Sequence, residues 1–405
     1  MLDGIYGSEY FEWDLPQMQF RVRSPRLLLI RKRLVQNHGS NSRESKLMKR
    51  MLPRESFVCR ERFDWELAAL FGNRWICIGR DHELAEGRYR AFEFGNHRGF
   101  VVRDETGAVR AFHNVCRHRG TQLLNCGSGP LKNNHVACPY HAWTYKTTGE
   151  LVGAPNMLDD PEFARGEFGL LRLDVESWNG FVFVRPGTSD QTIQQFFAEL
   201  GPLVQNWNLA SLVQADEIQY SVRANWKIFF QNYSECYHCP TVHPELNQLT
   251  PYKGAENDLI AGPILGGPMK LENAETISRN GKYCAAPIRG LVGEQVQQVF
   301  YFTIFPAMFL SLHPDYVMVH YLIPKDVNQT EVRCQFLIDP STDDSQLQIK
   351  QASEFWDEVN RQDWEVCELT QKGVESSAFV PGPYSRLESM VQAFDDHYRS
   401  CLDSR

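Results

Sequence analysis

The sequence of 405 residues lacks features that would place it in several special classes of protein. No stretch approaches the roughly 20 consecutive apolar residues that a helix needs to cross a bilayer, so we expect no membrane span. Basic residues are not in excess, because 42 Lys and Arg stand against 50 Asp and Glu, for a net charge of -8. A face that binds nucleic acid is normally basic, so no nucleic-acid partner is expected.

The cysteines lack the arrangement of a disulfide framework. There are 11 of them, an odd number, with irregular spacing and no secretory signal peptide before them. A reducing compartment, with cysteines serving as metal ligands or core residues, is the better interpretation. We therefore expect a cytoplasmic protein.

The first 50 residues differ in composition from the rest of the chain. Between Pro16 and Met51 there are ten Lys or Arg residues and one acid, Glu44. A basic segment that contains serine has features of an organellar transit peptide. A flexible extension, or an upstream start with Met51 opening the folded part, is the simpler interpretation. An organellar destination stays open beside the cytoplasmic one.

The next part of the chain has the residue pattern of a small β domain. From Arg74 to Pro186, short apolar alternations such as RWICIGR, FVVR and FVFVR are bounded by Gly, Asn and Asp-Glu turns. Alternation with period two and turns at short, regular intervals predicts strands, and a series of such strands predicts an all-β domain.

Beyond Gly187 the pattern changes to mixed helix and strand. Residues 191–212 look helical, residues 299–324 alternate as strands, and a strand-like start at residue 217 runs into a predicted helix over 225–239. The segment 345–373 contains no Pro and no Gly before its last residue, which predicts a long terminal helix. Strands followed by a terminal helix indicate an α+β fold with an antiparallel sheet.

Two close cysteine–histidine pairs stand in the β-rich part. Cys116 and His118 lie in CRHRG, and Cys138 and His141 lie in CPYH. Zinc can bind such a set, but zinc sites usually group cysteines with cysteines and histidines with histidines. One of each in both loops suits a two-iron, two-sulfide cluster in which two Cys hold one iron and two His the other. The spacing therefore favours a Rieske cluster over zinc.

A second metal site is predicted about 100 residues further on. His238 and His243 lie five residues apart, which on a continuous helix would turn them away from one face. Pro240 and Thr241 interrupt the segment and can bring both imidazoles to one point. A third ligand is needed to complete the two-His-one-carboxylate face that binds Fe(II) and leaves positions open for O2.

Asp363 is the candidate for that third ligand. It shares a predicted helix face with Val359, Val366 and Thr370. An acid on a mostly apolar stripe is costly unless it is paired or bound to a metal. We therefore predict that Asp363 joins His238 and His243.

The stretch NVCRHRG…CPYHAWTY resembles the Rieske non-haem iron oxygenases. Respiratory Rieske proteins have two further cysteines at the places of Thr121 and Tyr140, so the oxygenase type fits and the respiratory type does not. The later stretch NRQDWEVCE is also typical of the oxygenases and places their carboxylate ligand at Asp363. The resemblance covers about residues 55–400. Further matching residues are Asn225, Trp226, Lys227, Asn232, Glu235, His238 and His243.

The resemblance implies a role for each candidate residue. Cys116, His118, Cys138 and His141 hold the [2Fe-2S] cluster, and His238, His243 and Asp363 hold a mononuclear Fe(II). Glu235 and Asn232 are the expected catalytic residues. Glu235 is not a ligand but bridges the iron site to a Rieske histidine of a neighbouring subunit.

The resemblance also implies a fold and a division of the chain. A small all-β Rieske domain is followed by a helix-grip (START-like) catalytic domain with an antiparallel sheet. The expected divisions are a basic extension (1–50), a helix that packs on the catalytic domain (51–73), the Rieske domain (74–187) and the catalytic domain (188–405).

Three further cysteines need an interpretation. Cys236 and Cys239 form a CxxC, a pattern of zinc sites and redox disulfides. No second CxxC exists, and a disulfide here would sit between two predicted iron ligands. We interpret both as small buried side chains that fill space, and Cys126 as a loop thiol.

The substrate is indicated less sharply. Residues 310–324 and 360–389 are more similar to choline, glycine betaine, stachydrine and carnitine oxygenases than to naphthalene-type enzymes. This resemblance implies a monooxygenase that hydroxylates a quaternary ammonium compound, by N-demethylation of a betaine or by oxidation of choline or carnitine. The alternative is a ring-hydroxylating or O-demethylating oxygenase for an aromatic or other uncharged substrate. A third possibility, a Rieske electron carrier on a binding fold, would have lost the second set of ligands.

Aromatic faces hold a cationic nitrogen with about 0.5–2 kcal/mol each. Seven aromatic residues lie on strands expected to wall the pocket, although the pattern does not say which of them face it: Phe300, Tyr301, Phe302, Phe305, Phe309, Tyr316 and Tyr321.

The electron donor is expected to be a separate protein. No flavin or nicotinamide fingerprint and no plant-type ferredoxin cysteine set occurs in the chain. We therefore expect a flavin/ferredoxin-type reductase as partner. By analogy with the family, the assembly is expected to be a homotrimer.

Overall fold

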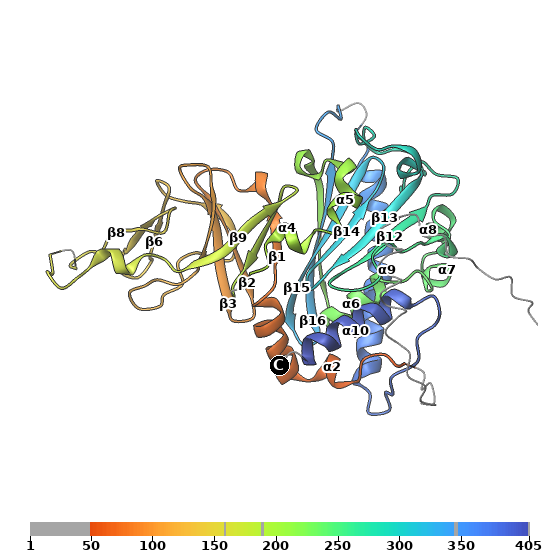
Figure 1. Cartoon of the computed structure of the whole chain (residues 1–405), viewed down its shortest axis with the longest axis horizontal. Coiled ribbons are helices and arrows are strands. Elements are labelled where there is room, and N and C mark those ends of the chain that lie inside the picture. Colours follow the sequence, from red (N-terminus) through yellow and green to blue (C-terminus); the bar gives the residue numbers. More distant parts are fainter. Residues whose placement is uncertain (1–48, 158, 188–189, 344–346, 404–405) are drawn as a thin grey trace, which may run out of the picture. The chain divides into compact units, whose positions relative to one another are not determined.

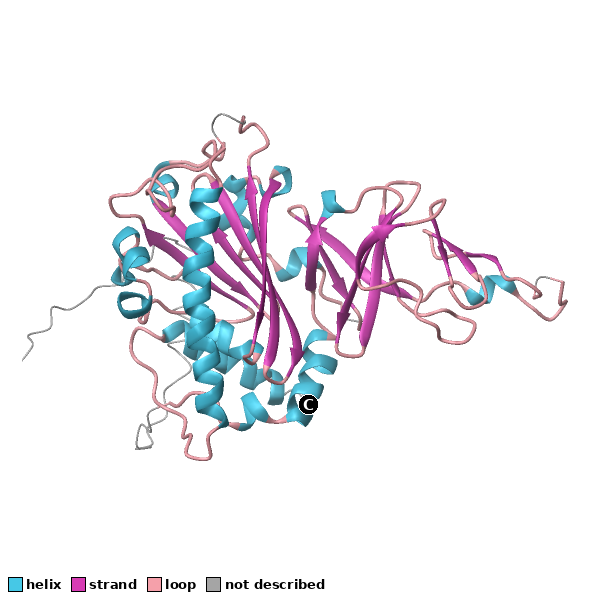
Figure 2. Ribbon diagram, turned by 180° about the vertical axis from the view of Figure 1, so that it is seen from behind, coloured by secondary structure: helices cyan, strands magenta, loops and turns pink. Residues whose placement is uncertain are grey.

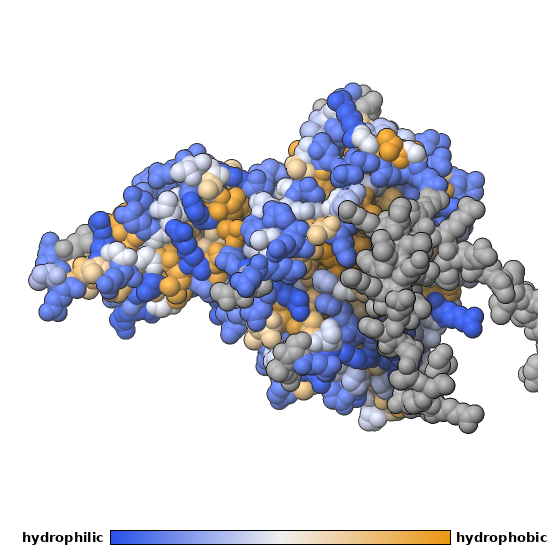
Figure 3. Space-filling view, viewed as in Figure 1, coloured by the Kyte–Doolittle hydropathy of each residue, from blue (hydrophilic) through white to orange (hydrophobic). Residues whose placement is uncertain are grey.

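The computed structural model describes residues 49–403, apart from 158, 188–189 and 344–346. Nearly all of the predicted basic extension, residues 1–48, lies outside the described residues. Among the described helices, none is long and apolar enough to cross a membrane. The face shown in Figure 3 is mainly hydrophilic, with apolar residues scattered between.

The first part of the described chain is built from two antiparallel sheets (Figure 1). The larger sheet has the order β1-β10-β9-β4-β3-β2-β5, and the smaller has the order β6-β7-β8. The predicted all-β domain is confirmed. Its strands are β1 (Ile76–Arg80), β2 (Arg88–Phe94), β3 (His97–Arg103), β4 (Val109–His113), β5 (Gly127–Pro130), β6 (His135–Ala137), β7 (Thr144–Lys146), β8 (Leu151–Gly153), β9 (Arg172–Trp178) and β10 (Phe181–Arg185).

The second part is a six-stranded antiparallel sheet with a long helix, α9 (Lys350–Glu375), along one face (Figure 2). The strand order is β11-β16-β15-β14-β13-β12. The α+β prediction is confirmed: β12 to β16 pair in sequence order, β11 adds to the edge at β16, and the long helices follow. The strands are β11 (Val213–Val222), β12 (Ile264–Lys270), β13 (Gln298–Ile304), β14 (Met308–Leu312), β15 (Tyr316–Asp326) and β16 (Gln329–Ile338).

Two helix predictions are corrected by the structure. Residues 191–212 form not one helix but the short α4 (Ile193–Phe196) and α5 (Gly201–Val204), followed by two 3-10 turns. Asn208 between those turns is left-handed, with φ of 47°, which a continuous helix cannot accept. The terminal helix α9 starts at Lys350 and runs through Gly373 to Glu375, since a glycine inside a helix is tolerated at a modest cost.

A further helix, α10 (Ser389–Asp403), was not predicted. It buries Met390, Phe394 and Tyr398, which recur every four residues. This apolar period was a usable signal, but the helix follows a Pro- and Gly-containing stretch that reads as a loop. The segment before β1 contains α2 (Glu55–Val58), α3 (Arg60–Trp65) and a π-helical turn over Glu66–Phe71.

A buried charge joins this segment to the catalytic part. The Glu66 carboxylate and the Lys227 ammonium are both fully buried, with Nζ 2.7 and 2.8 Å from the two carboxylate oxygens. Trp226 Nε1 donates to Glu66 at 2.8 Å, and the Tyr398 hydroxyl also donates to it. The Asn225-Trp226-Lys227 stretch of the sequence thus holds the start of helix α6 (Trp226–Tyr233).

We expect Glu66→Gln to destabilise the protein by about 3–5 kcal/mol, because it leaves the buried Lys227 ammonium without its counter-ion. The free energy of unfolding in urea measures the loss. Adding Lys227→Met should recover part of it, since no charge is then buried alone. Glu61→Gln, on the exposed side of α3, is the control and should leave the urea midpoint unchanged. A midpoint unchanged by Glu66→Gln would contradict the role of this pair.

Candidate metal centres

The segment that carries the two predicted iron histidines is broken at a different place from the one predicted. Helix α6 ends at Tyr233, and residues 234–238 form turns before the short α7 (Cys239–Val242). Pro240 does not interrupt a helix but stands in the first turn of α7, where its fixed φ is favourable. His238 therefore immediately precedes α7, and His243 immediately follows it.

The structure brings His238, His243 and Asp363 together. One ligand atom from each lies within 4.8 Å of the other two. Asp363 Oδ1 is 2.8 Å from His243 Nε2 and 3.3 Å from His238 Nε2. Helix α9 thus presents the carboxylate to two imidazoles that both point the same nitrogen at it.

The remaining ring nitrogens explain this orientation. His238 Nδ1 lies 2.6 Å from Glu235 Oε1, and His243 Nδ1 lies 2.6 Å from Gln362 Oε1. An Nδ1–H that donates to a side-chain oxygen leaves the Nε2 lone pair free for a metal. Both imidazoles are held in the tautomer that a metal needs.

The two predicted catalytic residues contact the same group. Asn232 Nδ2 donates to Asp363 Oδ1 at 3.0 Å. Glu235 Oε2 accepts from the backbone N–H groups of Tyr237 and His238, the latter at 3.2 Å. Glu235 therefore fixes both the ring and the backbone of His238.

The charges of this group call for a cation. Burial alone would lower the pKa of His238, but hydrogen bonds to Asp363 and Glu235 raise that pKa to about 10. Burial alone would raise the pKa of Asp363, but hydrogen bonds from His238 and His243 hold it far below its usual range. Two neutral nitrogens and a carboxylate oxygen fit Fe(II), which would supply the positive charge in place of that proton.

The apolar stripe predicted around Asp363 is partly wrong. The buried face of α9 includes Trp364, Cys367 and Gln371, whereas Val366 is half-buried and Thr370 is exposed. Asp363 therefore stands at the border of the buried face, where its carboxylate can reach the histidines.

Gln362 was not predicted, because its role depends on a contact with His243, 119 residues away. We expect Gln362→Ala to weaken Fe(II) binding by about 10–100-fold, as is typical when the partner of a metal-bound histidine is removed. Equilibrium titration of the iron-depleted mononuclear site measures this. Gln362→Glu keeps an acceptor oxygen and should retain most of the affinity. If Gln362→Ala binds Fe(II) as tightly as the parent does, the proposed role of Gln362 in orienting His243 is refuted.

The two predicted cluster loops have the same backbone conformation. In each, the cysteine N–H donates to the carbonyl five residues on, and the N–H four residues on donates back to the cysteine carbonyl. The fourth residue is left-handed in both loops: Gly120 (φ 73°) and Ala142 (φ 56°). The bonds are Cys116 N–Thr121 O (2.8 Å), Gly120 N–Cys116 O (3.1 Å), Cys138 N–Trp143 O (2.8 Å) and Ala142 N–Cys138 O (3.1 Å).

The side chains of these loops divide by burial. Cys116 and Cys138 are only 3% and 4% exposed, whereas His118 is exposed and His141 half-buried. The two imidazole centroids lie 4.7 Å apart, and His118 stacks on Trp143 at 4.8 Å. This fits a cluster with its thiolate-bound iron inside and its imidazole-bound iron at the surface.

Tyr145 is a neighbour of the cluster loops that the sequence did not indicate. Its hydroxyl oxygen lies 3.4 Å from Cys116 Sγ and accepts from the Arg117 N–H at 3.1 Å. A hydroxyl that donates to a ligating sulfur raises the reduction potential of an iron–sulfur cluster.

Successive side chains of a strand point to opposite sides of the sheet, and this divides the seven aromatic candidates for the pocket into two groups. Phe300, Phe302 and Tyr321 belong to the core on the far side of the sheet, so they cannot face the metal site. The core on the α9 side includes Phe305, Phe309 and Tyr316, with Tyr301 packed against it.

The residue after Asn232 in helix α6, Tyr233, packs against this core. Tyr233 stacks on Phe309 at 4.3 Å and meets Tyr301 edge-on at 6.1 Å. Its hydroxyl lies 2.6 Å from Ser311 Oγ, and Ser311 pairs with Tyr301 across the strands. Tyr233, Tyr301 and Phe309 therefore form one aromatic cluster that includes the residue after Asn232, and we call this cluster the aromatic wall.

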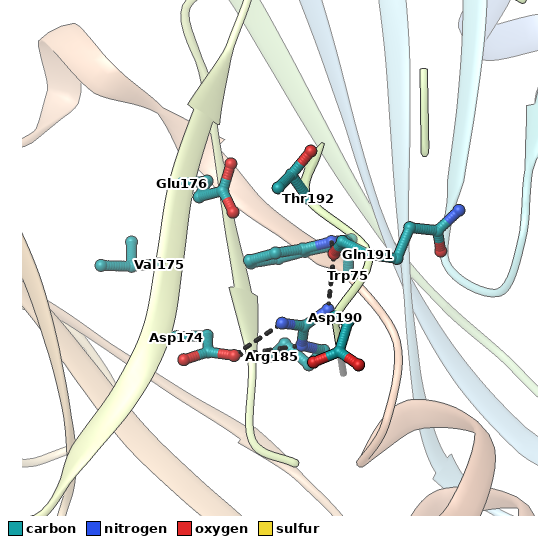
Figure 4. Close-up of a pocket in the computed structure, with 8 residues that line it drawn as sticks. All are labelled: Trp75, Asp174, Val175, Glu176, Arg185, Asp190, Gln191 and Thr192. Atoms are coloured by element: carbon teal, nitrogen blue, oxygen red, sulfur yellow. Dashed lines mark hydrogen bonds and ion pairs between the residues drawn. The ribbon is translucent and has the colours of Figure 1, made fainter. Parts of the chain in front are cut away.

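A separate surface cleft of about 230 Å³ contains none of the predicted site residues (Figure 4). Arg185 lies 4.3 Å from the Trp75 ring centroid, bonds Asp174 at 2.7 Å and donates to the Gln191 carbonyl at 2.8 Å. These contacts tie β10 to the chain that leaves it, so the cleft has a structural explanation.

Comparisons with known proteins agree with both metal centres. The Rieske [2Fe-2S] domain model matches residues 74–164, and the model of the ring hydroxylating alpha subunit (catalytic domain) matches residues 209–404. The glycine betaine monooxygenase oxygenase subunit of Chromohalobacter salexigens is 29% identical over 379 residues, which cover 85% of this chain and 84% of that protein.

Two more comparisons extend this result. Choline monooxygenase of Arabidopsis thaliana is 27% identical over 348 residues, 82% of this chain and 78% of that protein. The crystal structure of the quaternary ammonium Rieske monooxygenase CntA with L-carnitine has a TM-score of 0.70 at 23% identity, over 87% of this chain and 95% of that one. This likeness shows the fold. The two domain models together imply a Rieske [2Fe-2S] cluster and a mononuclear iron as cofactors. The chain belongs to the Rieske non-haem iron oxygenases as a monooxygenase alpha subunit.

Proposed function

We propose that this oxygenase hydroxylates a quaternary ammonium compound at a methyl or hydroxymethyl carbon close to the charged nitrogen. The observation that carries the proposal is the aromatic wall, which includes the residue after Asn232, the side chain that donates to Asp363. Aromatic faces attract a quaternary ammonium ion, which cannot donate hydrogen bonds. The names of the relatives, which include glycine betaine and choline monooxygenases, support the same substrate class.

In this proposal Cys116, His118, Cys138 and His141 hold the cluster, and His238, His243 and Asp363 hold the mononuclear iron. The cluster supplies single electrons, and the iron supplies the chemistry that activates dioxygen. Glu235 and Gln362 orient the two imidazoles, and Asn232 holds the Asp363 carboxylate by its 3.0 Å hydrogen bond.

The aromatic wall orients the substrate. In this proposal Tyr233, Tyr301 and Phe309 supply the aromatic rings, and each close aromatic face contributes about 0.5–2 kcal/mol to the binding of a cation. With an N-methyl substrate, hydroxylation gives a carbinolamine that releases formaldehyde and the demethylated amine. With choline, a second hydroxyl on the alcohol carbon gives an aldehyde hydrate.

The electrons come from a separate reductase of the flavin/ferredoxin type in this proposal, and the assembly is a homotrimer. Glu235 then bridges the iron site of one subunit to a Rieske histidine of the next. The exposure of His118 at the protein surface is compatible with such a contact.

A substrate screen with a borrowed reductase tests the proposal. We expect oxygen uptake that depends on substrate, and formaldehyde release, with one or more of glycine betaine, choline and carnitine. A benzoate should give neither. The Tyr301→Ala variant should raise KM for the ammonium substrate by roughly 2- to 30-fold, the loss of one aromatic contact.

Turnover of the benzoate alone would overturn the proposed substrate class in favour of the alternative, an oxygenase for aromatic or other uncharged substrates. Tyr252→Ala is the matched control for Tyr301→Ala, because Tyr252 lies on a 3-10 turn outside the aromatic wall. An unchanged KM in the Tyr301 variant would remove the wall from substrate binding.

A further inference from the structure

We propose that Cys236 and Cys239 are a redox-sensitive pair whose oxidation to a disulfide switches off the mononuclear iron site. Cys239 is buried, as predicted for a side chain that fills space, but Cys236 is only half-buried, and both are free thiols. Disulfide formation itself depends only on the pair. Its effect on iron rests on the proposed ligand role of His238.

The backbone between the two cysteines suits a disulfide. The Cys239 N–H donates to the Cys236 carbonyl at 3.1 Å, which closes a four-residue turn. The α-carbons at the ends of such a turn lie less than about 7 Å apart, and most disulfides span 4.4–6.8 Å. Closing the bond is therefore compatible with the backbone of this turn.

That turn contains His238. Cys239 Sγ lies 3.9 Å from His238 Nε2, the nitrogen that faces Asp363. The backbone N–H groups of Tyr237 and His238, in the middle of the turn, donate hydrogen bonds to the Glu235 carboxylate. The two sulfur atoms must approach to about 2.05 Å in a disulfide, so the ring closes around the residue that presents Nε2 to the metal.

Hydrogen peroxide is the oxidant that we propose. The half-buried Cys236 thiol reacts with one H2O2 to give a sulfenic acid and one water. The Cys239 sulfur then displaces the hydroxyl as a second water and forms the S–S bond. Two thiols are oxidised, one peroxide is reduced, and the thiol protons leave in the two waters. A thiol reductant reverses the reaction.

The test uses the full-length holoenzyme with both metal centres. A few equivalents of H2O2 are added and free thiols are alkylated. The mass of the proteolytic peptide that contains residues 236 and 239 is then measured by mass spectrometry. We expect a peptide without alkyl groups whose mass is lower than that of the dithiol form by two hydrogen atoms. We expect iron to fall from about three to about two atoms per chain, with the Rieske paramagnetic signal unchanged. Dithiothreitol with Fe(II) should restore the third iron.

Matched variants keep the proposal falsifiable. Cys236→Ser should keep its third iron under the same peroxide treatment, and Cys239→Ser gives a second comparison. Cys126→Ser removes an exposed thiol elsewhere and should respond as the parent does. Equal iron loss in Cys236→Ser, or no disulfide in the parent, would overturn the proposal. A disulfide that forms while iron stays bound would overturn the switch but would leave the proposed ligand role of His238 untouched.

Discussion

We expect the Asp363→Ala variant to lose its mononuclear iron and its turnover while it keeps the Rieske cluster. Asp363 Oδ1 is the atom that both histidine Nε2 atoms approach, at 2.8 and 3.3 Å, so its removal leaves two neutral ligands and no anion. Iron should fall from about three atoms per chain to about two, because the cluster alone holds two. Metal analysis and the paramagnetic signal of the reduced cluster separate the two centres.

Glu365→Ala is the control for this variant, since Glu365 lies on the exposed side of the same helix. It should bind iron and turn over as the parent does. If Asp363→Ala still binds the third iron with parental affinity, the two-His-one-carboxylate assignment is wrong. Loss of the cluster signal as well would mean that the variant disturbs the fold and not one site.

Glu235→Gln is expected to keep all the iron but to lose turnover by about 10–100-fold. A glutamine oxygen can still accept from His238 Nδ1, which the carboxylate meets at 2.6 Å, so the imidazole keeps its orientation. The negative charge is lost, and with it the proposed response of this bridge to the oxidation state of the neighbouring cluster. Iron content, steady-state turnover and the rate of cluster oxidation in a single turnover measure the effect.

The single-turnover experiment shows whether the Glu235→Gln variant slows the oxidation of the cluster. A slower oxidation of the cluster with iron unchanged supports a bridge between the centres. Normal turnover would refute the bridge. Glu245→Gln, at an exposed position of α8 (Pro244–Leu249), changes the charge of the neighbouring helix and should have no effect.

Some of the site could be predicted because its signals are local. Each cluster loop carries its cysteine and histidine within a few residues, and the same pair of backbone hydrogen bonds closes both loops. The spacing of His238 and His243 likewise belongs to one segment. The errors were also local: the helix ends at Tyr233 and not at residue 239, and Pro240 starts α7 where an interruption was predicted.

Other features depend on contacts between distant segments. Gln362 became a partner of His243 only because α9 lies beside the α7 segment, and Glu66 reaches Lys227 across 161 positions of the chain. The same holds for the aromatic residues of β13 and β14: Tyr301 and Phe302 are adjacent in sequence, yet one packs toward α9 and the other away from it.

The sequence by itself determined the chemistry that the chain can carry, because the types and spacing of its thiols, imidazoles and carboxylates decide which metals they suit. The α+β class followed from alternation and from the absence of proline and internal glycine in one long segment. Only the tertiary structure decided which oxygen orients each imidazole and which aromatic rings pack on the α9 side of the sheet. Those choices depend on the packing of α9 against the sheet, where burial selects one register among several that the pattern allows.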